Sequence, residues 1–203
     1  LGHDGWLYFS THRGSTRTTT DENHYRGDWI LRHHPELGRT EVVAHAPLPK
    51  QCLPTGLLDP ERLIFYAGTA DGDYKVKRVQ FLAYDVAQRR VLYSDDFGPY
   101  RPAIWSSSTG RVYFQREGRR GEVLPLVRLA PAQPGPPTPV NAQVGLRACT
   151  QETPDGIVYT VDGDNLWAFH VRTETAEHLG PTAVGTQEYI ATIDADPSNH
   201  RYL

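Results

Sequence analysis

The stretch DGIVYTVDGDNLWAFHVRTETAEHLG, Asp155–Gly180, decides the fold. It holds three short runs rich in apolar and aromatic residues, each entered from a polar or Gly-containing turn, and this pattern predicts β-strands joined by hairpins. A fourth run, RACTQE (Arg147–Glu152), precedes it and ends in TPDG. The segment therefore predicts one sheet of four antiparallel strands.

The same pattern recurs along the whole chain. Its second-strand runs are DGWLYFS, ERLIFYAG, TGRVYFQ, DGIVYTV and SNHRYL, which align on the aromatic residues Tyr8, Phe65, Tyr113, Tyr159 and Tyr202. The intervals are 57, 48, 46 and 43 residues, inside or somewhat above the roughly 40 to 50 of propeller blades. The sequence thus predicts an all-β partial β-propeller of about four four-stranded antiparallel blades.

We expect a single domain over residues 1–203, with blades at about 1–46, 47–96, 97–145 and 146–188 and the start of another at 189–203. In the third blade the Pro-rich stretch Ala130–Val140 obscures the fourth strand, so an edge strand or an irregular loop is expected there. Because a propeller closes its ring, we interpret the chain as about half of a six- to eight-bladed ring. Its expected partner is the remainder of that ring, since both end blades have uncovered edges and faces.

Composition and charge exclude several functions. With 24 acidic and 21 basic residues the formal net charge is −3, which argues against a nucleic-acid partner. No run approaches the roughly 20 apolar residues of a membrane span. Cys52 and Cys149 are too far apart for a zinc-ribbon motif and are expected as two thiols or one disulfide. Phosphate-binding, dinucleotide-binding and nucleophile-elbow motifs are absent from the sequence.

Loop length marks one rim of the predicted propeller. From the aligned aromatic to its expected third-strand partner (Arg32, Tyr84, Arg128 and Phe169) the separations are 24, 19, 15 and 10 residues. Insertions concentrated on one rim indicate a binding face.

Arg, His and Tyr side chains gather on this rim. Arginine offers forked donors for carboxylates and phosphates, and tyrosine offers a flat ring against which a sugar or peptide can stack. We therefore predict a polar or anionic ligand at His12, Arg13, Arg17, His24, Arg26, Asp71, Asp73, Tyr74, Lys75, Tyr100, Arg101 and Gln187. The alternative is a solvated loop whose charges pair with one another.

Metal sites are less well supported by the residue pattern. His12 and His24 with Asp21, or with a carboxylate of the next blade, form one hypothetical divalent site, but their spacing matches no metal motif. The segment Thr69–Tyr74 lacks the acidic ladder of a calcium loop and is expected as a β-turn. We predict no cofactor.

The segments LAYDVAQRRVLYSDD (Leu82–Asp96) and LWAFHVRTETAEHLG (Leu166–Gly180) carry a resemblance. They resemble bacterial propellers of the quinoprotein-like, Tyr-Val-Thr-Asn-type and oligogalacturonate-lyase-like group, which are often exported. The resemblance implies a propeller fold and an extracellular or periplasmic location. The four Trp do not recur at one blade position as in quinoproteins, so no family's catalytic residues are transferred.

Two functions follow. The first is an exported binding or sensing propeller that holds a carbohydrate or another polar ligand on the long-loop face. The second is a carbohydrate-active enzyme, such as a lyase of an acidic polysaccharide. There, Arg would neutralise a uronate carboxylate while His, Tyr or Lys removes the adjacent proton.

Overall fold

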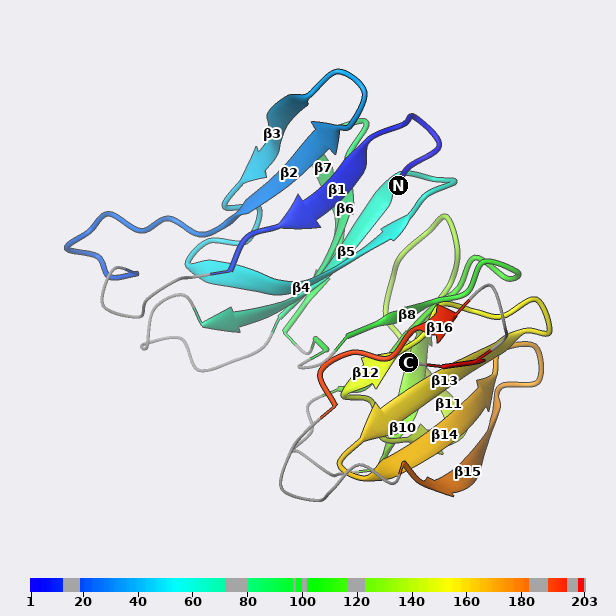
Figure 1. Ribbon diagram of the computed structural model, residues 1–203. Helices are drawn as coiled ribbons and strands as arrows, with labels where there is room; N and C mark the ends of the chain where they lie inside the picture. The colour runs from blue at the N-terminus through cyan, green and yellow to red at the C-terminus, as the bar shows by residue number, and fades with distance from the viewer. Residues whose placement is uncertain are drawn as a thin grey trace. The chain divides into compact units, whose positions relative to one another are not determined.

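The computed structural model describes residues 1–12, 19–71, 80–96, 98–99, 102–116, 123–182, 190–196 and 201–202. Every regular element in these ranges is a β-strand, and no helix occurs in them (Figure 1). The strands are β1 (Leu7–Ser10), β2 (Trp29–His34), β3 (Arg39–His45), β4 (Gln51–Asp59), β5 (Ile64–Asp71), β6 (Phe81–Asp85), β7 (Arg90–Asp95), β8 (Ile104–Trp105), β9 (Val112–Phe114), β10 (Leu124–Leu129), β11 (Thr138–Val144), β12 (Ala148–Cys149), β13 (Ile157–Asp162), β14 (Asn165–His170), β15 (Thr175–Pro181), β16 (Ala195–Asp196) and β17 (Arg201–Tyr202).

These strands form successive antiparallel meanders, in which neighbours along the chain are also neighbours in the sheet. β1–β3 make a three-stranded sheet, and β4–β7, β8–β11 and β12–β15 make four-stranded sheets, followed by the pair β16–β17. The predicted all-β class with four-stranded repeats is therefore confirmed. β8 and β12, the first strands of their sheets, have two residues each.

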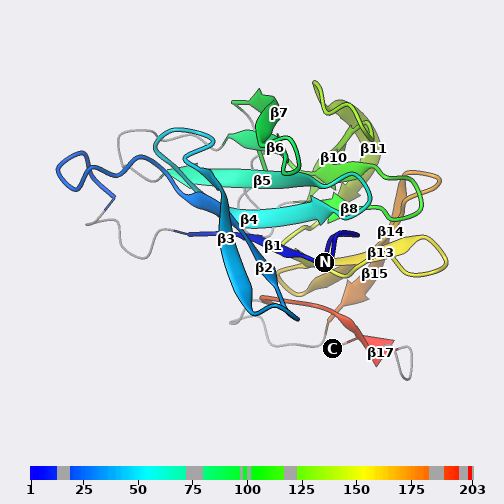
Figure 2. The same cartoon turned by 90° about the horizontal axis from the view of Figure 1, so that it is seen from above.

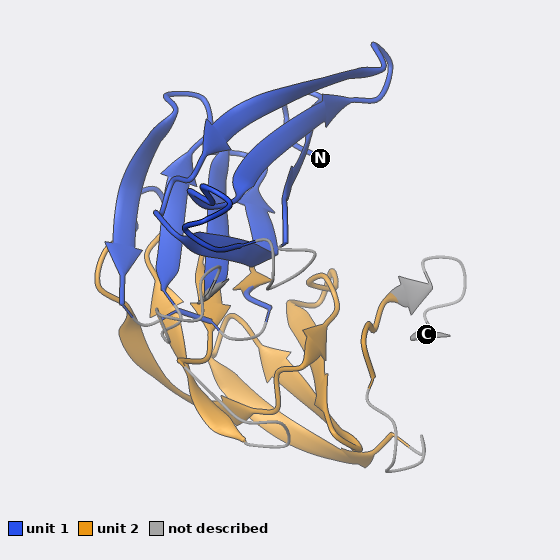
Figure 3. Ribbon diagram, turned by 90° about the vertical axis from the view of Figure 1, so that its left-hand side faces the viewer, with its two compact units in different colours: residues 1–103, 132–134 blue, residues 104–131, 135–203 orange. Residues whose placement is uncertain are grey.

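The chain divides into two compact units, which Figure 3 colours separately. Unit 1 is residues 1–103 with 132–134, and unit 2 is residues 104–131 with 135–203. Unit 1 contains the sheets β1–β3 and β4–β7, and unit 2 contains β8–β11, β12–β15 and the pair β16–β17. The expected blade boundaries stay a prediction.

The core of unit 1 lies between its two sheets, β1–β3 and β4–β7, which Figure 2 shows from above. Alternate residues of each strand face this core because successive side chains of a strand point to opposite sides. The buried set is Ile30, Val43, Leu53, Leu63, Phe65, Ala67, Leu82, Tyr84 and Val86, with Tyr8 packed against it.

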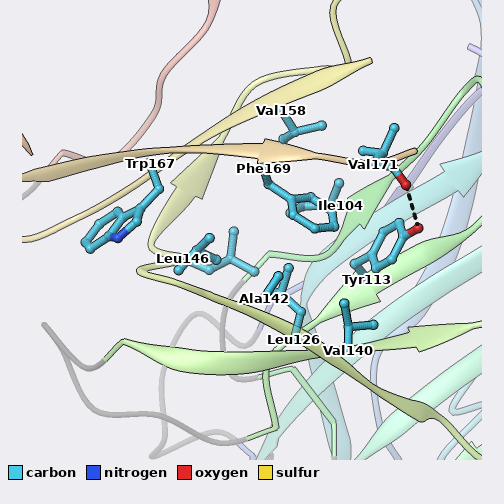
Figure 4. Packing of buried hydrophobic residues seen from close by; sticks show 11 residues of the cluster. Ile104, Tyr113, Leu126, Val140, Ala142, Leu146, Val158, Trp167, Phe169 and Val171 are labelled. Carbon is cyan, nitrogen blue, oxygen red and sulfur yellow. Dashed lines mark hydrogen bonds between the residues drawn. The ribbon is translucent and has the colours of Figure 1, made fainter. Parts of the chain in front are cut away.

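The core of unit 2 is built in the same way from β8–β11 and β12–β15 (Figure 4). Tyr113 packs edge-to-face on Phe169, with ring centroids 4.9 Å apart. Its hydroxyl donates to the Val171 carbonyl at 3.4 Å and to Glu174 Oε1 at 3.0 Å. Glu174 also binds Arg111 and Arg128 at 2.9 and 2.7 Å. One carboxylate in the β14–β15 turn thus ties the two sheets of unit 2 together.

The turns that precede β1, β5, β9 and β13 show which residues are equivalent in the repeat. Each contains one residue in the left-handed region, with φ between 53° and 81°: Gly5, Leu63, Gly110 and Gly156. A tyrosine follows three residues later in every case: Tyr8, Tyr66, Tyr113 and Tyr159. These tyrosines pair across to Arg32, Ala83, Arg128 and Ala168.

This register corrects two sequence-based alignments. Tyr66, not Phe65, is equivalent to the other tyrosines, and Phe65 packs into the opposite side of its sheet, as Val158 does in unit 2. Phe169 pairs with Val158 and not with Tyr159. The separations become 24, 17, 15 and 9 residues, so the loop still shortens along the chain.

The Pro-rich stretch resolves into both expected alternatives. Residues 131–137 contain no strand, and β11 begins only at Thr138 and forms the edge of its sheet. Pro139 lies in this edge strand, where a missing N–H is tolerated.

Candidate ligand-binding site

Four of the predicted site residues lie in the described ranges. His12, His24 and Arg26 are exposed on the long connection from β1 to β2. Asp71 is the last residue of β5. The other predicted residues lie outside the described ranges: Arg13, Arg17, Asp73, Tyr74, Lys75, Tyr100, Arg101 and Gln187.

The described end of this connection is a compact turn. The amides of Asn23 and Tyr25 both donate to the Thr20 carbonyl, at 3.2 Å each. The backbone amide of His24 donates to the Asp21 carbonyl at 3.0 Å, and His24 has φ 54°. These bonds hold the exposed His24 and Arg26 and the half-buried Tyr25 in one short segment.

The β3–β4 connection supports this turn from the side. Lys50 forms an ion pair with Asp21. The Lys50 amide donates to the Arg26 carbonyl at 2.8 Å. These two contacts hold the β1–β2 and β3–β4 connections together.

A surface hollow of about 300 Å³, here called the rim pocket, opens between this turn and the sheet. It is lined by Asn23, His24, Tyr25, Arg26, Gly27, Trp29 and His45. The Trp29 and His45 rings are stacked, 4.6 Å apart and 5° from parallel. The pocket thus combines a flat aromatic wall with the guanidinium-bearing Arg26 and the imidazole of His24.

A β-bulge creates the stacked wall. The pairing of β2 with β3 shifts by one residue between Ile30 and Leu31, so Trp29 lies opposite His45. Without that extra residue the partner of Trp29 would be Ala44. Neither Trp29 nor His45 is among the predicted site residues, because a bulge has no clear signature in this stretch.

Asp28 lies directly behind the rim pocket and is 3% exposed. The Tyr25 hydroxyl donates to its Oδ1 at 3.0 Å. Its other oxygen, Oδ2, accepts no hydrogen bond from the described residues. Burial raises the pKa of Asp28, an effect that Tyr25, the Leu53 amide, His12 and Thr11 only partly offset. The buried Asp28 carboxyl, whose burial costs free energy, thus holds the pocket-lining Tyr25 in place.

Gln51 is a second buried polar residue, and its backbone is hydrogen-bonded to that of Asp28. The Asp28 amide donates to the Gln51 carbonyl at 3.0 Å. The Gln51 side chain is fully buried and accepts a hydrogen bond from the Thr69 hydroxyl at 2.7 Å. Its Nε2 has no partner among the described residues. The rim therefore rests on a buried polar layer and not on apolar packing alone.

Other sequence expectations concern metals, thiols and membranes. The described residues contain no group of three His, Cys, Asp or Glu side chains placed to hold a metal ion. In the same ranges neither Cys52 nor Cys149 forms a disulfide, and burial raises the pKa of Cys149 to about 12. No helix suited by length and apolar character to cross a bilayer occurs in the described part of the chain.

Comparison with known proteins assigns the fold. The chain matches the Swd1 β-propeller domain of Myceliophteria thermophila with a TM-score of 0.52, at 10% identity. It matches the Dos1 propeller with a TM-score of 0.54, at 10% identity. The fold is a β-propeller. A third match is the extracellular domain of a putative one-component system from B. thetaiotaomicron, with a TM-score of 0.61 and 13% identity.

These matches cover most of this chain but only part of the other proteins. They include 82%, 86% and 100% of this propeller chain and 57%, 43% and 24% of the respective matched chains. No family model and no curated protein matches the sequence. The likeness therefore establishes the fold, and function rests on the site.

Proposed function

We propose that this propeller is a binding module that holds a carbohydrate or another polar, anionic ligand in the rim pocket. The observation that carries the proposal is the stacked Trp29–His45 wall beside Arg26 in an open hollow. A flat aromatic wall accommodates the apolar face of a sugar ring, and a guanidinium pairs with a carboxylate. An acidic sugar offers both features in one ligand.

The proposal includes export of the protein. Its support is the resemblance to often-exported propellers and the match to a domain described as extracellular. Both are fold-level analogies.

Binding of oligogalacturonate, with a neutral cello-oligosaccharide for comparison, tests the proposal by isothermal titration calorimetry. We expect Trp29→Ala to weaken binding about tenfold, because the stacking surface is lost. Trp29→Phe keeps a ring and should retain most of the affinity. Arg26→Ala should remove the preference for the acidic sugar.

The matched control for Arg26→Ala is Arg90→Ala. Arg90 is exposed at the first position of β7, and its Nε donates to the Gln88 side-chain oxygen. It should leave binding unchanged. No binding of any acidic or neutral sugar by the unmutated protein, or equal loss in the control, would remove the proposal.

The same ligands test the lyase alternative. A lyase creates a carbon–carbon double bond that absorbs ultraviolet light. An increase in that absorbance during incubation would favour the lyase over the binding module. Binding without such an increase supports the binding module.

A further inference from the structure

The Asp28 carboxyl lies one hydrogen bond behind the wall of the rim pocket. The Tyr25 hydroxyl donates to its Oδ1 at 3.0 Å, and Tyr25 lines the pocket. Asp28 itself is 3% exposed, and its Oδ2 accepts no hydrogen bond from the described residues. Because burial with so few hydrogen bonds disfavours the charged form, the surroundings of this carboxyl decide whether it holds a proton.

Backbone contacts on both sides hold Asp28 in place. The Asp28 amide donates to the Gln51 carbonyl at 3.0 Å, and the Ala46 amide donates to the Asp28 carbonyl at 2.7 Å. The preceding residue, Gly27, is pressed against the β3–β4 connection: a Cβ atom there would lie 2.9 Å from the Cβ of Ala46 and 3.0 Å from the Leu48 carbonyl oxygen. Moving the short Asp28 side chain out to water requires breaking these contacts. The smaller change for Asp28 is to bind or release a proton.

The charge of Asp28 depends on its burial and on groups from the neighbouring segments. Burial has the largest effect and raises the pKa of Asp28, whereas the Tyr25 hydroxyl, the Leu53 amide, His12 and Thr11 lower it. Other charged or titratable side chains lie on the segments around it, namely Arg26, His24 and His45, which line the pocket, and Lys50, which pairs with Asp21. Any pH dependence of Asp28 is therefore to be separated from that of the histidines.

A ligand anion in the rim pocket changes the balance for this proton. Arg26 and His24 line the hollow and are the side chains suited to hold a carboxylate. A negative charge beside the wall opposes a second negative charge on Asp28, and a bound ligand also displaces water from the pocket. Both effects favour protonated Asp28. By reciprocity, protonation of Asp28 strengthens binding of the anion by the same factor.

We propose that the rim pocket binds an acidic sugar together with a proton on Asp28, so that its affinity for the anion falls as pH rises. This regulation rests on the proposed function, since it acts on the same site. The sign follows from linkage: affinity is highest where the free protein already holds the proton, falls between the pKa of Asp28 in the free and in the ligand-bound protein, and is lowest above both. The neutral cello-oligosaccharide adds no charge beside Asp28, so its affinity should change much less with pH.

Isothermal titration calorimetry of oligogalacturonate, in two buffers of different ionisation enthalpy, measures both the affinity and the protons taken up. Between about pH 5 and about pH 8, where the ligand carboxylates stay ionised, the parent protein should lose about tenfold in affinity, which corresponds to a pKa change of about one unit on binding. It should take up part of a proton near the midpoint. Asp28→Asn keeps an acceptor for the Tyr25 hydroxyl but cannot titrate. This variant should take up no such proton and should bind more tightly than the parent at about pH 8.

Asp95→Asn is the matched control. Asp95 also accepts a hydrogen bond from a tyrosine, Tyr93, at 2.7 Å, but it lies on β7 and does not line the rim pocket. This variant should keep the pH dependence of the parent. Because imidazoles change charge in the same pH range, His24→Gln separates their part, and the fall in affinity that depends on Asp28 should persist in it. Tyr25→Phe removes a hydrogen bond that lowers the pKa of Asp28, so it should move that fall to higher pH.

Equal pH dependence of oligogalacturonate binding in the parent and in Asp28→Asn would overturn the proton linkage and leave the proposed function standing. So would weaker binding by Asp28→Asn than by the parent at about pH 8, because Asp28 would then act only by holding Tyr25 in place. Absence of binding at every pH would instead remove the proposed function, and the linkage with it. If Asp28→Asn does not fold, Tyr25→Phe decides: a fall in affinity that stays at the same pH, or moves to lower pH, contradicts the linkage.

Discussion

Two tyrosines at one repeat position differ in what their hydroxyls bind. The Tyr66 hydroxyl is buried without a partner among the described residues, and burial raises its pKa. The equivalent Tyr113 hydroxyl binds Glu174 and the Val171 carbonyl. A buried polar group costs free energy when it is unbonded and contributes when it is bonded.

We therefore expect opposite effects from the same substitution. Tyr66→Phe should leave the unfolding free energy unchanged or raise it by about 1 kcal/mol, and Tyr113→Phe should lower it by about 1 to 2 kcal/mol. Urea unfolding of the two variants measures both. A loss of equal size at Tyr66 would show that its hydroxyl has a partner.

Asp28 makes stability depend on pH in a definite direction. Because its pKa is raised by burial, the folded protein keeps this proton over a pH range in which the unfolded chain has lost it. Its contribution to the unfolding free energy therefore falls as pH rises through the folded pKa. Asp28→Asn removes that fall, so the variant should gain stability relative to the parent at about pH 7 compared with about pH 4. Equal differences at both pH values would contradict this.

At the scale of elements, the turn between the third and fourth strands of a blade has a fixed shape. Its last residue is left-handed in three sheets, at Gly38, Arg89 and Glu174, with φ of 59°, 54° and 55°. Residues other than glycine are strained there. At Glu174 the contacts of the carboxylate with Arg111, Arg128 and Tyr113 offset this strain.

Arg89 is the turn residue best suited to replacement. Arg89→Gly should raise the unfolding free energy by about 0.5 to 1 kcal/mol, since the strain outweighs the extra freedom of glycine in the unfolded chain. Arg90→Gly, one residue later in β7, should instead lower it by a similar amount. Thermal unfolding of the pair distinguishes this from a general effect of losing an arginine.

Element existence could be predicted from the sequence, but the exact register could not. The adjacent aromatics Phe65 and Tyr66 give no signal of which one faces the core of unit 1. The turn residue that would align them is Gly5, Gly110 or Gly156 in the other repeats but Leu63 in this one. Leu63 accepts the left-handed conformation because its side chain packs in the core of unit 1.

The candidate site could be predicted only in part, because some of its residues are brought together by strand register and burial. A loop rich in Arg and His pointed to His24 and Arg26, which line the rim pocket. Trp29 and His45 come from two strands that only the bulge at Ile30 and Leu31 brings opposite each other. Asp28 and Gln51 are defined by burial, which a polar residue in a loop sequence does not indicate.

For the whole molecule, repetition was the strongest sequence signal. Short aromatic strands at a near-constant interval predicted successive meanders, and comparison with solved propellers confirms that fold. The same repetition identifies the exposed Leu7 and Phe9 as positions that other blades bury. The proposed binding, in contrast, depends on the β1–β2 connection, which is the longest of these loops.

The central claim is that this connection forms the ligand site. Amide chemical shifts followed during titration with oligogalacturonate test it most directly. The account predicts shifts concentrated at residues 23–27, Trp29 and His45, which line the rim pocket, and their loss in Trp29→Ala. Shifts confined to the opposite ends of the strands, around Gly38 and Arg89, would contradict it.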